Sequence, residues 1–296
     1  MSEKPRFTIL EDRGLLAVSG SDRVSFLQGL VSNDVEKAGS GRAVYAALLT
    51  PQGKYLHDFF MIQINDVLFL DCERAGLDGL KKKLSLYKLR ADVALEDRSE
   101  DFTVAALFAT GTPEAPDLGS DSGGVAYPDP RLASAGARAI LPRETAETVL
   151  GQAGFEAAPF EDYDRLRLGL GLPDASRDLI ADKSILLESG FDELNGVDWD
   201  KGCYMGQELT ARTKYRGLVK KRLMPVTFDA PPPDAGTPVM AGDREAGEVR
   251  SSLVTEDGGI GLALMRLEYL DSAENLTADG IGVIPFRPDW MEIPDP

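Results

Sequence analysis

One glycine-rich segment carries the most information about this chain: Lys201-Gly202-Cys203-Tyr204-Met205-Gly206-Gln207-Glu208, followed by Leu209-Thr210-Ala211-Arg212. It contains one of only two cysteines, beside a lysine and close to two glycines. Because glycine adopts backbone angles that other residues resist, the segment predicts a turn, and residues 207–213 predict a short helix after it.

A cysteine in this position has two interpretations. Unpaired N–H groups at a helix start, together with Lys201, would lower the pKa of the Cys203 thiol and favour the thiolate. The same groups would also suit a carboxylate or phosphate of a ligand. The alternative is a buried cysteine that packs as a small apolar side chain in a turn. The spacing alone leaves both open.

Length and charge limit the remaining functions. The chain has 296 residues, which favours two domains. Its net charge of −17 disfavours direct binding to nucleic acid or to an anionic membrane. No apolar run approaches the roughly 18 residues of a membrane span, and the first residues lack the layout of a signal peptide. We expect a cytoplasmic protein with a small soluble ligand or a protein partner.

The supply of metal ligands is short. Cys72, Cys203 and His57 are the only cysteines and histidine, and they are far apart in sequence. An iron–sulfur cluster or a structural zinc site usually needs four ligands. A cluster would therefore be shared with a partner, with Cys203 as the contribution from this chain. A catalytic pair of Cys203 and His57 is a weaker alternative, because a lone histidine in a strand is usually packed or exposed.

The chain ahead of the cysteine segment predicts an α+β fold with mainly antiparallel sheets, because its elements lack the regular alternation of a doubly wound parallel sheet. A surface loop is expected over residues 111–124. Apolar runs predict strands at 7–10, 15–18, 43–49, 55–64, 67–72, 93–95, 103–108 and 137–141, and apolar spacing predicts helices at 24–31, 77–87, 144–152 and 160–169.

The C-terminal part predicts a small barrel or sandwich. Four short runs, 223–228, 247–253, 260–267 and 281–286, are separated by turn-forming residues. We place the domain boundary between residues 215 and 216, which gives domains of 1–215 and 216–296.

Basic residues gather around this boundary of an acidic chain. They form either a solvated connector or an electropositive mouth that attracts an anionic ligand, such as the carboxylates of a folate-like molecule. The six residues are Arg212, Lys214, Arg216, Lys220, Lys221 and Arg222.

The segment KGCYMGQE at 201–208 resembles the signature of the YgfZ family, folate-binding proteins that assist iron–sulfur enzymes and are relatives of the glycine-cleavage T protein, an aminomethyltransferase. The likeness covers nearly the whole chain. Further segments that resemble the family in the same order are SDRVSFLQGLVSNDV from Ser21, ALLTPQGKYLHDFF from Ala47, YDRLRLGLGLPDASRD from Tyr163, LNGVDWDKGCYMGQELTARTKYRG from Leu194 and GTPVMAGDREAGEVRSS from Gly236.

This resemblance implies ferredoxin-like antiparallel α/β units around a central folate pocket, followed by a small β-barrel. It implies binding of tetrahydrofolate or a derivative. It also implies a role in the assembly or repair of iron–sulfur enzymes, especially [4Fe–4S] enzymes and including tRNA-modifying ones. The partners would be iron–sulfur assembly proteins or client enzymes, and a transient cluster could be shared with them.

The resemblance also implies site residues. Cys203 would be the working thiol, with Lys201 beside it; the matching motif positions are Gly202, Tyr204, Gly206, Gln207 and Glu208. Tyr163 would stack on a pterin ring, and Glu188 would accept two hydrogen bonds from its aminopyrimidine edge. Arg212 and Arg216 would receive the glutamate tail of folate. For Tyr163 and Glu188, ordinary packing and a surface acid remain the alternatives.

One departure from the T protein matters for activity. That protein uses an aspartate in an Asn-Ala…Lys-Asp setting, whereas here Asp78 lies near that register without the surrounding motif. We therefore do not expect aminomethyltransferase activity. Two alternatives stay open: a folate-dependent one-carbon transferase or demethylase with Asp78 or another acid as general base, and a docking scaffold that has lost folate binding.

Overall fold

The computed structural model describes residues 4–109, 111, 114–270 and 275–293. The chain forms two compact units. The first consists of Met1–Tyr163 with Leu194–Gln207, and the second consists of Asp164–Glu193 with Glu208–Pro296.

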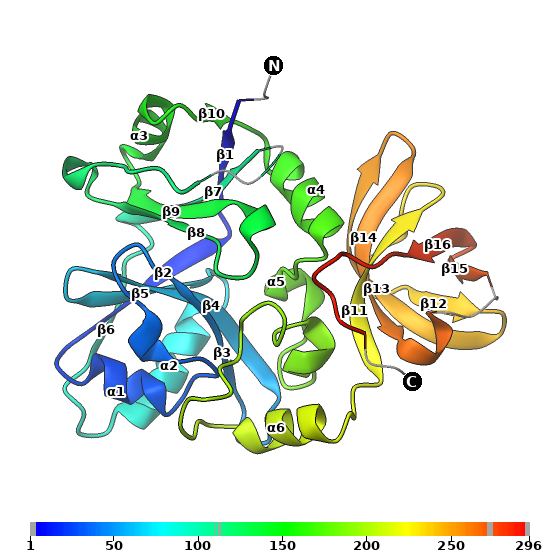
Figure 1. Ribbon diagram of the computed structural model, residues 1–296, viewed down its shortest axis with the longest axis horizontal. Helices are drawn as coiled ribbons and strands as arrows, with labels where there is room; N and C mark the ends of the chain where they lie inside the picture. The colour runs from blue at the N-terminus through cyan, green and yellow to red at the C-terminus, as the bar shows by residue number, and fades with distance from the viewer. Residues whose placement is uncertain (1–3, 110, 112–113, 271–274, 294–296) are drawn as a thin grey trace. The chain divides into compact units, whose positions relative to one another are not determined.

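The first unit contains an antiparallel sheet covered by two helices (Figure 1). Helix α1 spans Arg23–Gln28 and helix α2 spans Leu77–Lys88. Leucines on these helices pack with Leu16, Val18, Phe59 and Leu70 of the sheet in one apolar core. In spatial order the strands are β3 (Val44–Leu49), β4 (Tyr55–Ile64), β5 (Val67–Glu73), β2 (Arg13–Ser19) and β6 (Ala94–Asp97).

A second sheet of the same unit packs against helix α3 (Ala146–Gln152). Among the strand pairs described, only β1 with β10 is parallel. Strands β8 and β10, of four and two residues, were not predicted from the sequence. The predicted loop 111–124 includes residues 112–113, which lie outside the described residues. The spatial order is β10 (Glu156–Ala157), β1 (Arg6–Ile9), β7 (Phe102–Phe108), β9 (Ala137–Pro142) and β8 (Val125–Pro128).

The second unit contains a closed antiparallel barrel, so the barrel is confirmed over the sandwich. The sequence predicted four of its strands and missed β12 and β15, which are four and three residues long. In barrel order the strands are β11 (Lys221–Phe228), β14 (Gly258–Arg266), β13 (Arg244–Thr255), β12 (Pro238–Ala241), β15 (Leu276–Ala278) and β16 (Ile281–Pro285).

The remaining elements are helices, some of a single turn. Arg167 joins several parts of the second unit: it is 3% exposed and donates hydrogen bonds to Asp164, Asp178 and Ser251. The helices not yet named are α4 (Phe160–Leu170), α5 (Ala175–Asp178), α6 (Gln207–Tyr215), η1 (Val35–Lys37), η2 (Ser120–Ser122), η3 (Ala133–Ala135), η4 (Leu186–Ser189) and η5 (Leu267–Tyr269).

The expected α+β class with mainly antiparallel sheets is confirmed by these pairings. The domain boundary after residue 215 stays a prediction. Residues 164–193 cluster with the barrel unit, and residues 194–207 cluster with the first unit.

Candidate functional site

The segment 195–206, here called the cysteine loop, is attached to the chain that follows α1. Its backbone and side chains exchange hydrogen bonds with residues 29–33, so two segments far apart in sequence are held as one structure. The bonds run from Asp198 N to Ser32 O (3.0 Å), Ser32 Oγ to Gly196 O (2.6 Å), Asn33 Nδ2 to Asn195 O (2.7 Å) and Met205 N to Gly29 O (3.1 Å).

Lys201 anchors the loop most firmly. Its ammonium donates to the carbonyl oxygens of Gln28 (2.9 Å), Val31 (2.7 Å) and Asn33 (2.7 Å). These carbonyls lie at and beyond the C-terminus of α1, where backbone acceptors lack helical partners. The residue is 8% exposed, and burial lowers the pKa of Lys201 to about 8. All three ammonium protons therefore hold the loop, and a role for Lys201 beside the thiol stays a prediction.

Gly206 fixes the other end of the loop. Its φ of +82° belongs to the left-handed region that favours glycine. A Cβ atom here would lie 2.5 Å from the carbonyl oxygen of Thr50 and 3.0 Å from Cα of Gly53, in the turn between β3 and β4. Both the backbone conformation and the close approach to this turn require glycine. The predicted turn at 201–206 thus has a defined packing partner.

Gly202 and Cys203 lie between these anchors and face solvent. A Cβ atom on Gly202 would have no neighbour within 4 Å. Cys203 is exposed, so it is not the buried cysteine of the alternative interpretation. The other cysteine, Cys72, is 2% exposed within the apolar core, and burial raises the pKa of its thiol to about 12. Only one of the two thiols is placed for chemistry at the surface.

A hollow of about 530 Å³ opens beside the cysteine loop within the first unit. It is lined by Asn33, Lys37, residues 41–45, Pro128, Pro130, Asn195 and residues 197–200. Aromatic side chains of Tyr45 and Trp199 line it together with an ion pair between Lys37 and Asp198. Burial would raise the pKa of Asp198, but hydrogen bonds from Lys37 and from backbone N–H groups hold that pKa below its ordinary value. The hollow has the size of a small-molecule site.

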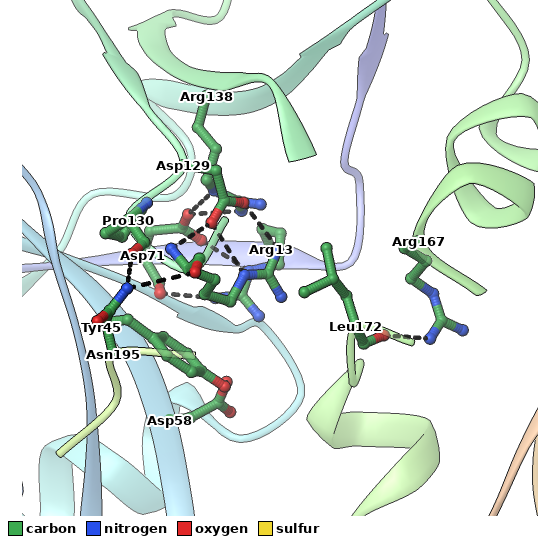
Figure 2. Close-up of polar contacts among 11 residues, drawn as sticks. Arg13, Tyr45, Asp58, Asp71, Asp129, Pro130, Arg138, Arg167, Leu172 and Asn195 are labelled. Carbon is green, nitrogen blue, oxygen red and sulfur yellow. Dashed lines mark hydrogen bonds and ion pairs between the residues drawn. The ribbon is translucent and has the colours of Figure 1, made fainter. Parts of the chain in front are cut away.

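Behind Tyr45, buried charges link the two sheets of the first unit (Figure 2). Asp71 is fully buried on β5 and accepts hydrogen bonds from Arg13 Nε (2.7 Å) and Arg138 Nη2 (2.7 Å). Asp129 accepts from Arg131 Nη2 (2.8 Å). Burial would raise the pKa of both carboxyl groups, yet the neighbouring arginines hold both pKa values below the ordinary aspartate value.

Asp58 is a buried carboxylate that the sequence reasoning missed. It is 5% exposed and accepts hydrogen bonds from the hydroxyls of Tyr45 (2.9 Å) and Tyr55 (3.0 Å). Burial and the negative charge of Asp58 raise the pKa of both tyrosines, so both remain donors. A charged residue inside the apolar run 55–64 was the available signal, because such a residue needs a buried partner.

The predicted folate residues are divided between the two units. In the first unit, Tyr163 is 7% exposed and its ring centroid lies 5.9 Å from that of Phe108. In the second unit, Glu188 is half-buried in η4, and Arg212 and Arg216 are exposed on and just after α6. Neither unit alone contains the whole predicted set, so the folate site stays a prediction.

The motif positions around the thiol are also divided between the two units. Tyr204 is 7% exposed, and its ring centroid lies 5.3 Å from the Lys201 ammonium. Gln207, half-buried, is the last residue of the first unit and the first of α6. Glu208 is exposed in the first turn of that helix. The predicted helix after the turn is confirmed, and it extends to Tyr215.

The basic cluster is only partly a surface feature. Arg222 is 3% exposed and donates to Glu193 (2.7 Å) and to the carbonyl oxygen of Leu187 (2.9 Å). Lys214 forms an ion pair with Asp192 (2.8 Å). Including Arg222 in an open electropositive mouth was therefore wrong, because its charge is used inside the second unit.

Two further residues can be placed. Asp78, the predicted base of the transferase alternative, is exposed in the first turn of α2. His57 packs against the same helix, since a Cβ atom on Gly76 would lie 3.3 Å from its Nδ1. Burial lowers the pKa of His57, so it is a packed, neutral histidine.

Comparisons with known proteins agree with this geometry. Residues 220–293 match the family model described as the CAF17 C-terminal beta-barrel domain. The mitochondrial iron–sulfur cluster assembly factor IBA57 of Mus musculus is 33% identical, over 95% of this chain and 84% of its own length. The Homo sapiens protein of the same name is 32% identical, with the same two coverages.

The fold also occurs in a solved structure. The glycine cleavage system aminomethyltransferase T from Bartonella henselae matches with a TM-score of 0.77, over 98% of this chain and 87% of that chain, at 16% identity. The predicted T-protein-like α+β fold with a C-terminal barrel is thereby confirmed. The chain belongs to the IBA57/CAF17 (YgfZ-type) family of iron–sulfur cluster assembly factors.

Proposed function

We propose that this assembly factor acts through the Cys203 thiol on clusters destined for [4Fe–4S] enzymes, including tRNA-modifying ones. The observation that carries the proposal is the exposure of Cys203 on a loop fixed at both ends, by Lys201 and by Gly206. A fixed loop presents the sulfur to a large partner without the entropic cost of ordering it on contact.

Cys203 would supply one thiolate to a cluster that a partner also ligates. Clusters of the [4Fe–4S] type use four such ligands. In the part of the chain that the structure describes, no group of three or more His, Cys, Asp or Glu side chains could hold a metal ion. The other ligands would therefore come from an iron–sulfur assembly protein or from the client enzyme.

Complementation tests this role. Cells that lack their own factor would receive the wild type, Cys203→Ser or Cys72→Ser, and the activity of a [4Fe–4S] enzyme would be measured at equal protein abundance. We expect Cys203→Ser to fail and Cys72→Ser to restore activity, since Cys72 is buried in the core. Full activity of Cys203→Ser would remove the thiol from the proposal.

Tetrahydrofolate or a derivative is the proposed ligand of the fold. The chemistry of the residues fits: Tyr163 is an aromatic ring, Glu188 is a half-buried carboxylate, and Arg212 and Arg216 are exposed cations suited to a glutamate tail. Bound folate would stabilise the folded protein. The residues themselves bind and orient the ligand.

The one-carbon transferase alternative finds no support at Asp78. That carboxylate lies with Lys81 and Lys82 on the exposed side of α2. A general base must reach the proton that it removes, and no predicted folate residue lies on this helix.

Calorimetry separates the folate proposal from the scaffold alternative. Tetrahydrofolate would be titrated under reducing conditions into the wild type, Tyr163→Ala and the matched control Tyr269→Ala, which lies in the barrel. We expect binding in the micromolar range for the wild type and the control, weakened about tenfold or more by Tyr163→Ala. Absence of binding in all three proteins would favour a docking scaffold without folate.

The compartment also remains a proposal. The two relatives are named as mitochondrial proteins, whereas the composition led us to expect the cytoplasm. No helix within the described residues is both long and apolar enough to cross a membrane. Fractionation of cells that express the tagged protein would decide between the compartments.

A further inference from the structure

Helix α2 has an exposed stripe on the side away from its core. Leu77, Leu80 and Leu84 are buried against the sheet. Lys82, Ser85 and Leu86 are exposed, and their spacing of three and four residues places them along one face of α2, while Leu89 is exposed just beyond the helix end. Leu86 is 71% exposed and Leu89 is 89% exposed. The stripe and its flanking cations Lys81, Lys88 and Arg90 are here called the α2 surface.

The α2 surface is basic within a strongly acidic protein. Between Asp78 and Asp92 the sequence contains five lysines or arginines and no acid, although the net charge of the chain is −17. Within the described residues, the side chains of Lys81, Lys82 and Arg90 form no ion pair or hydrogen bond. Their charges are therefore available to an acidic partner. When the partner is in contact, the opposite charges lie closer together than the Debye length, so salt screens their attraction only partly.

Leu89 has a backbone conformation that leucine rarely adopts. Its φ is +44° and its ψ is −104° at the C-terminal cap of α2. A residue with a Cβ pays about 1 kcal/mol or more for such a left-handed conformation, whereas glycine does not. Burial of the leucine side chain does not offset that cost in the isolated chain, because the side chain is exposed. Contact with a partner would offset it.

A shallow, open hollow on α2 favours a protein partner over a membrane. It has a volume of about 460 Å³ and is lined by Asp78, Lys81, Lys82, Ser85 and Leu86. A protruding apolar side chain of a protein fills a hollow, while a lipid surface leaves it open. Lys81 and Lys82, which line it, suit carboxylates of the partner, whereas Asp78 at the start of the helix does not.

We propose that the α2 surface docks an acidic segment of a partner protein, with an apolar side chain of the partner in the hollow beside Leu86. This inference uses neither Cys203 nor folate. It gives the protein a second contact that recruits a partner through charge and two leucines, apart from the loop that carries the thiol.

Fluorescence anisotropy of a labelled peptide tests the proposal. The probe is a helical peptide rich in glutamate, with leucines spaced three and four residues apart. It would be titrated with the wild-type protein, Leu86→Ser, Lys82→Glu and Lys183→Glu. Lys183 is an exposed lysine of the second unit, so its variant changes the net charge by the same amount elsewhere. A peptide with glutamine in place of glutamate is the second control.

We expect the acidic peptide to bind the wild type and Lys183→Glu equally, and to lose about tenfold or more in affinity with Leu86→Ser and Lys82→Glu. No binding of the peptide would overturn the proposal. Equal weakening by Lys183→Glu would also overturn it, because charge alone would then explain binding. Binding to vesicles of phosphatidylserine and phosphatidylcholine without binding to the peptide would assign the surface to lipid instead.

Discussion

Gly206 is the position where one added methyl group should destabilise the cysteine loop most. Gly206→Ala places a Cβ 2.5 Å from Thr50 O and forces a φ of +82° on a residue that resists it. We expect a loss of about 2–4 kcal/mol in the free energy of unfolding, measured by urea denaturation. The matched control is Gly202→Ala, which meets no neighbour within 4 Å and should change stability little. Equal effects of the two variants would contradict the packing described.

Lys201 should make stability depend on pH in the alkaline range. Burial lowers the pKa of Lys201 in the folded chain to about 8, below the ordinary 10.5. Between these values the unfolded chain binds more protons, so this residue makes the free energy of unfolding rise with pH. Lys201→Met lacks this contribution. It also leaves three carbonyls without their donor, at a cost of about 2 kcal/mol or more.

The measurement is urea denaturation of the wild type and Lys201→Met at several pH values from 7 to 10. The stability advantage of the wild type should widen as the pH rises through 8. Parallel pH profiles would show that the ammonium is not held in a desolvated position. A variant as stable as the wild type at pH 7 would show that the three hydrogen bonds contribute nothing.

Between the elements, Asp71 is the main link between the two sheets of the first unit. It is fully buried on β5, and Arg13 on β2 and Arg138 on β9 both donate to it. Asp71→Asn would leave two guanidinium groups without their counter-charge. We expect a loss of about 3–5 kcal/mol in the free energy of unfolding at pH 7. Lys4→Ala, which removes an exposed ion pair with Glu156, is the control and should have little effect.

The same network should contribute to acid sensitivity. Burial alone would raise the pKa of Asp71, but the two arginines hold it below the ordinary value of 3.8. The carboxylate therefore stabilises the fold above about pH 4, and this stabilisation is lost as the pH falls through the lowered pKa. The difference between wild type and Asp71→Asn should narrow in acid. If the difference in unfolding free energy between the two proteins stayed constant in acid, the Asp71 carboxylate would not be the group whose protonation destabilises the fold.

The elements themselves were largely predictable, and their long-range partners were not. Apolar spacing identified α2, which has one buried face, and continuous apolar runs identified β4 and β5, whose central residues are buried on both faces. Strand β10 escaped because two residues are too few to show a period, and β8 escaped because its four residues end in proline, which is rare inside strands. Helix α1 was predicted to reach residue 31 but ends at Gln28. Leu30 and Val31, which continue its apolar pattern, pack in the core beyond the helix end.

The candidate site was predictable in composition only. The sequence identified Cys203 and its glycines, but the acceptors of the Lys201 ammonium lie 168 to 173 residues earlier in the chain. No local pattern reveals such a partner. Asp58 was missed for a related reason: one of its tyrosine donors, Tyr55, is near it on β4, but the other, Tyr45, lies on the neighbouring strand β3, and only strand register brings it to Asp58. The sequence could indicate a buried charge there without naming what satisfies it.

Across the chain, the exposed basic surface and the exposed thiol lie on different segments. The protein is strongly acidic, yet unpaired cations gather on the α2 surface, and the exposed thiol lies on the cysteine loop. Docking at the α2 surface is proposed independently of any reaction at Cys203. Binding at the α2 surface should therefore weaken with rising salt, whereas the chemistry of Cys203 should not depend on that surface.

Reactivation of a purified apo [4Fe–4S] enzyme tests the central claim most directly. The enzyme would be incubated anaerobically with one iron–sulfur donor protein and with wild type, Cys203→Ser or Cys72→Ser, and the recovery of its activity would be timed. The account predicts that Cys203→Ser slows recovery by about tenfold or more, while Cys72→Ser, altered only in the buried core, matches the wild type. Equal recovery with Cys203→Ser and the wild type would contradict it.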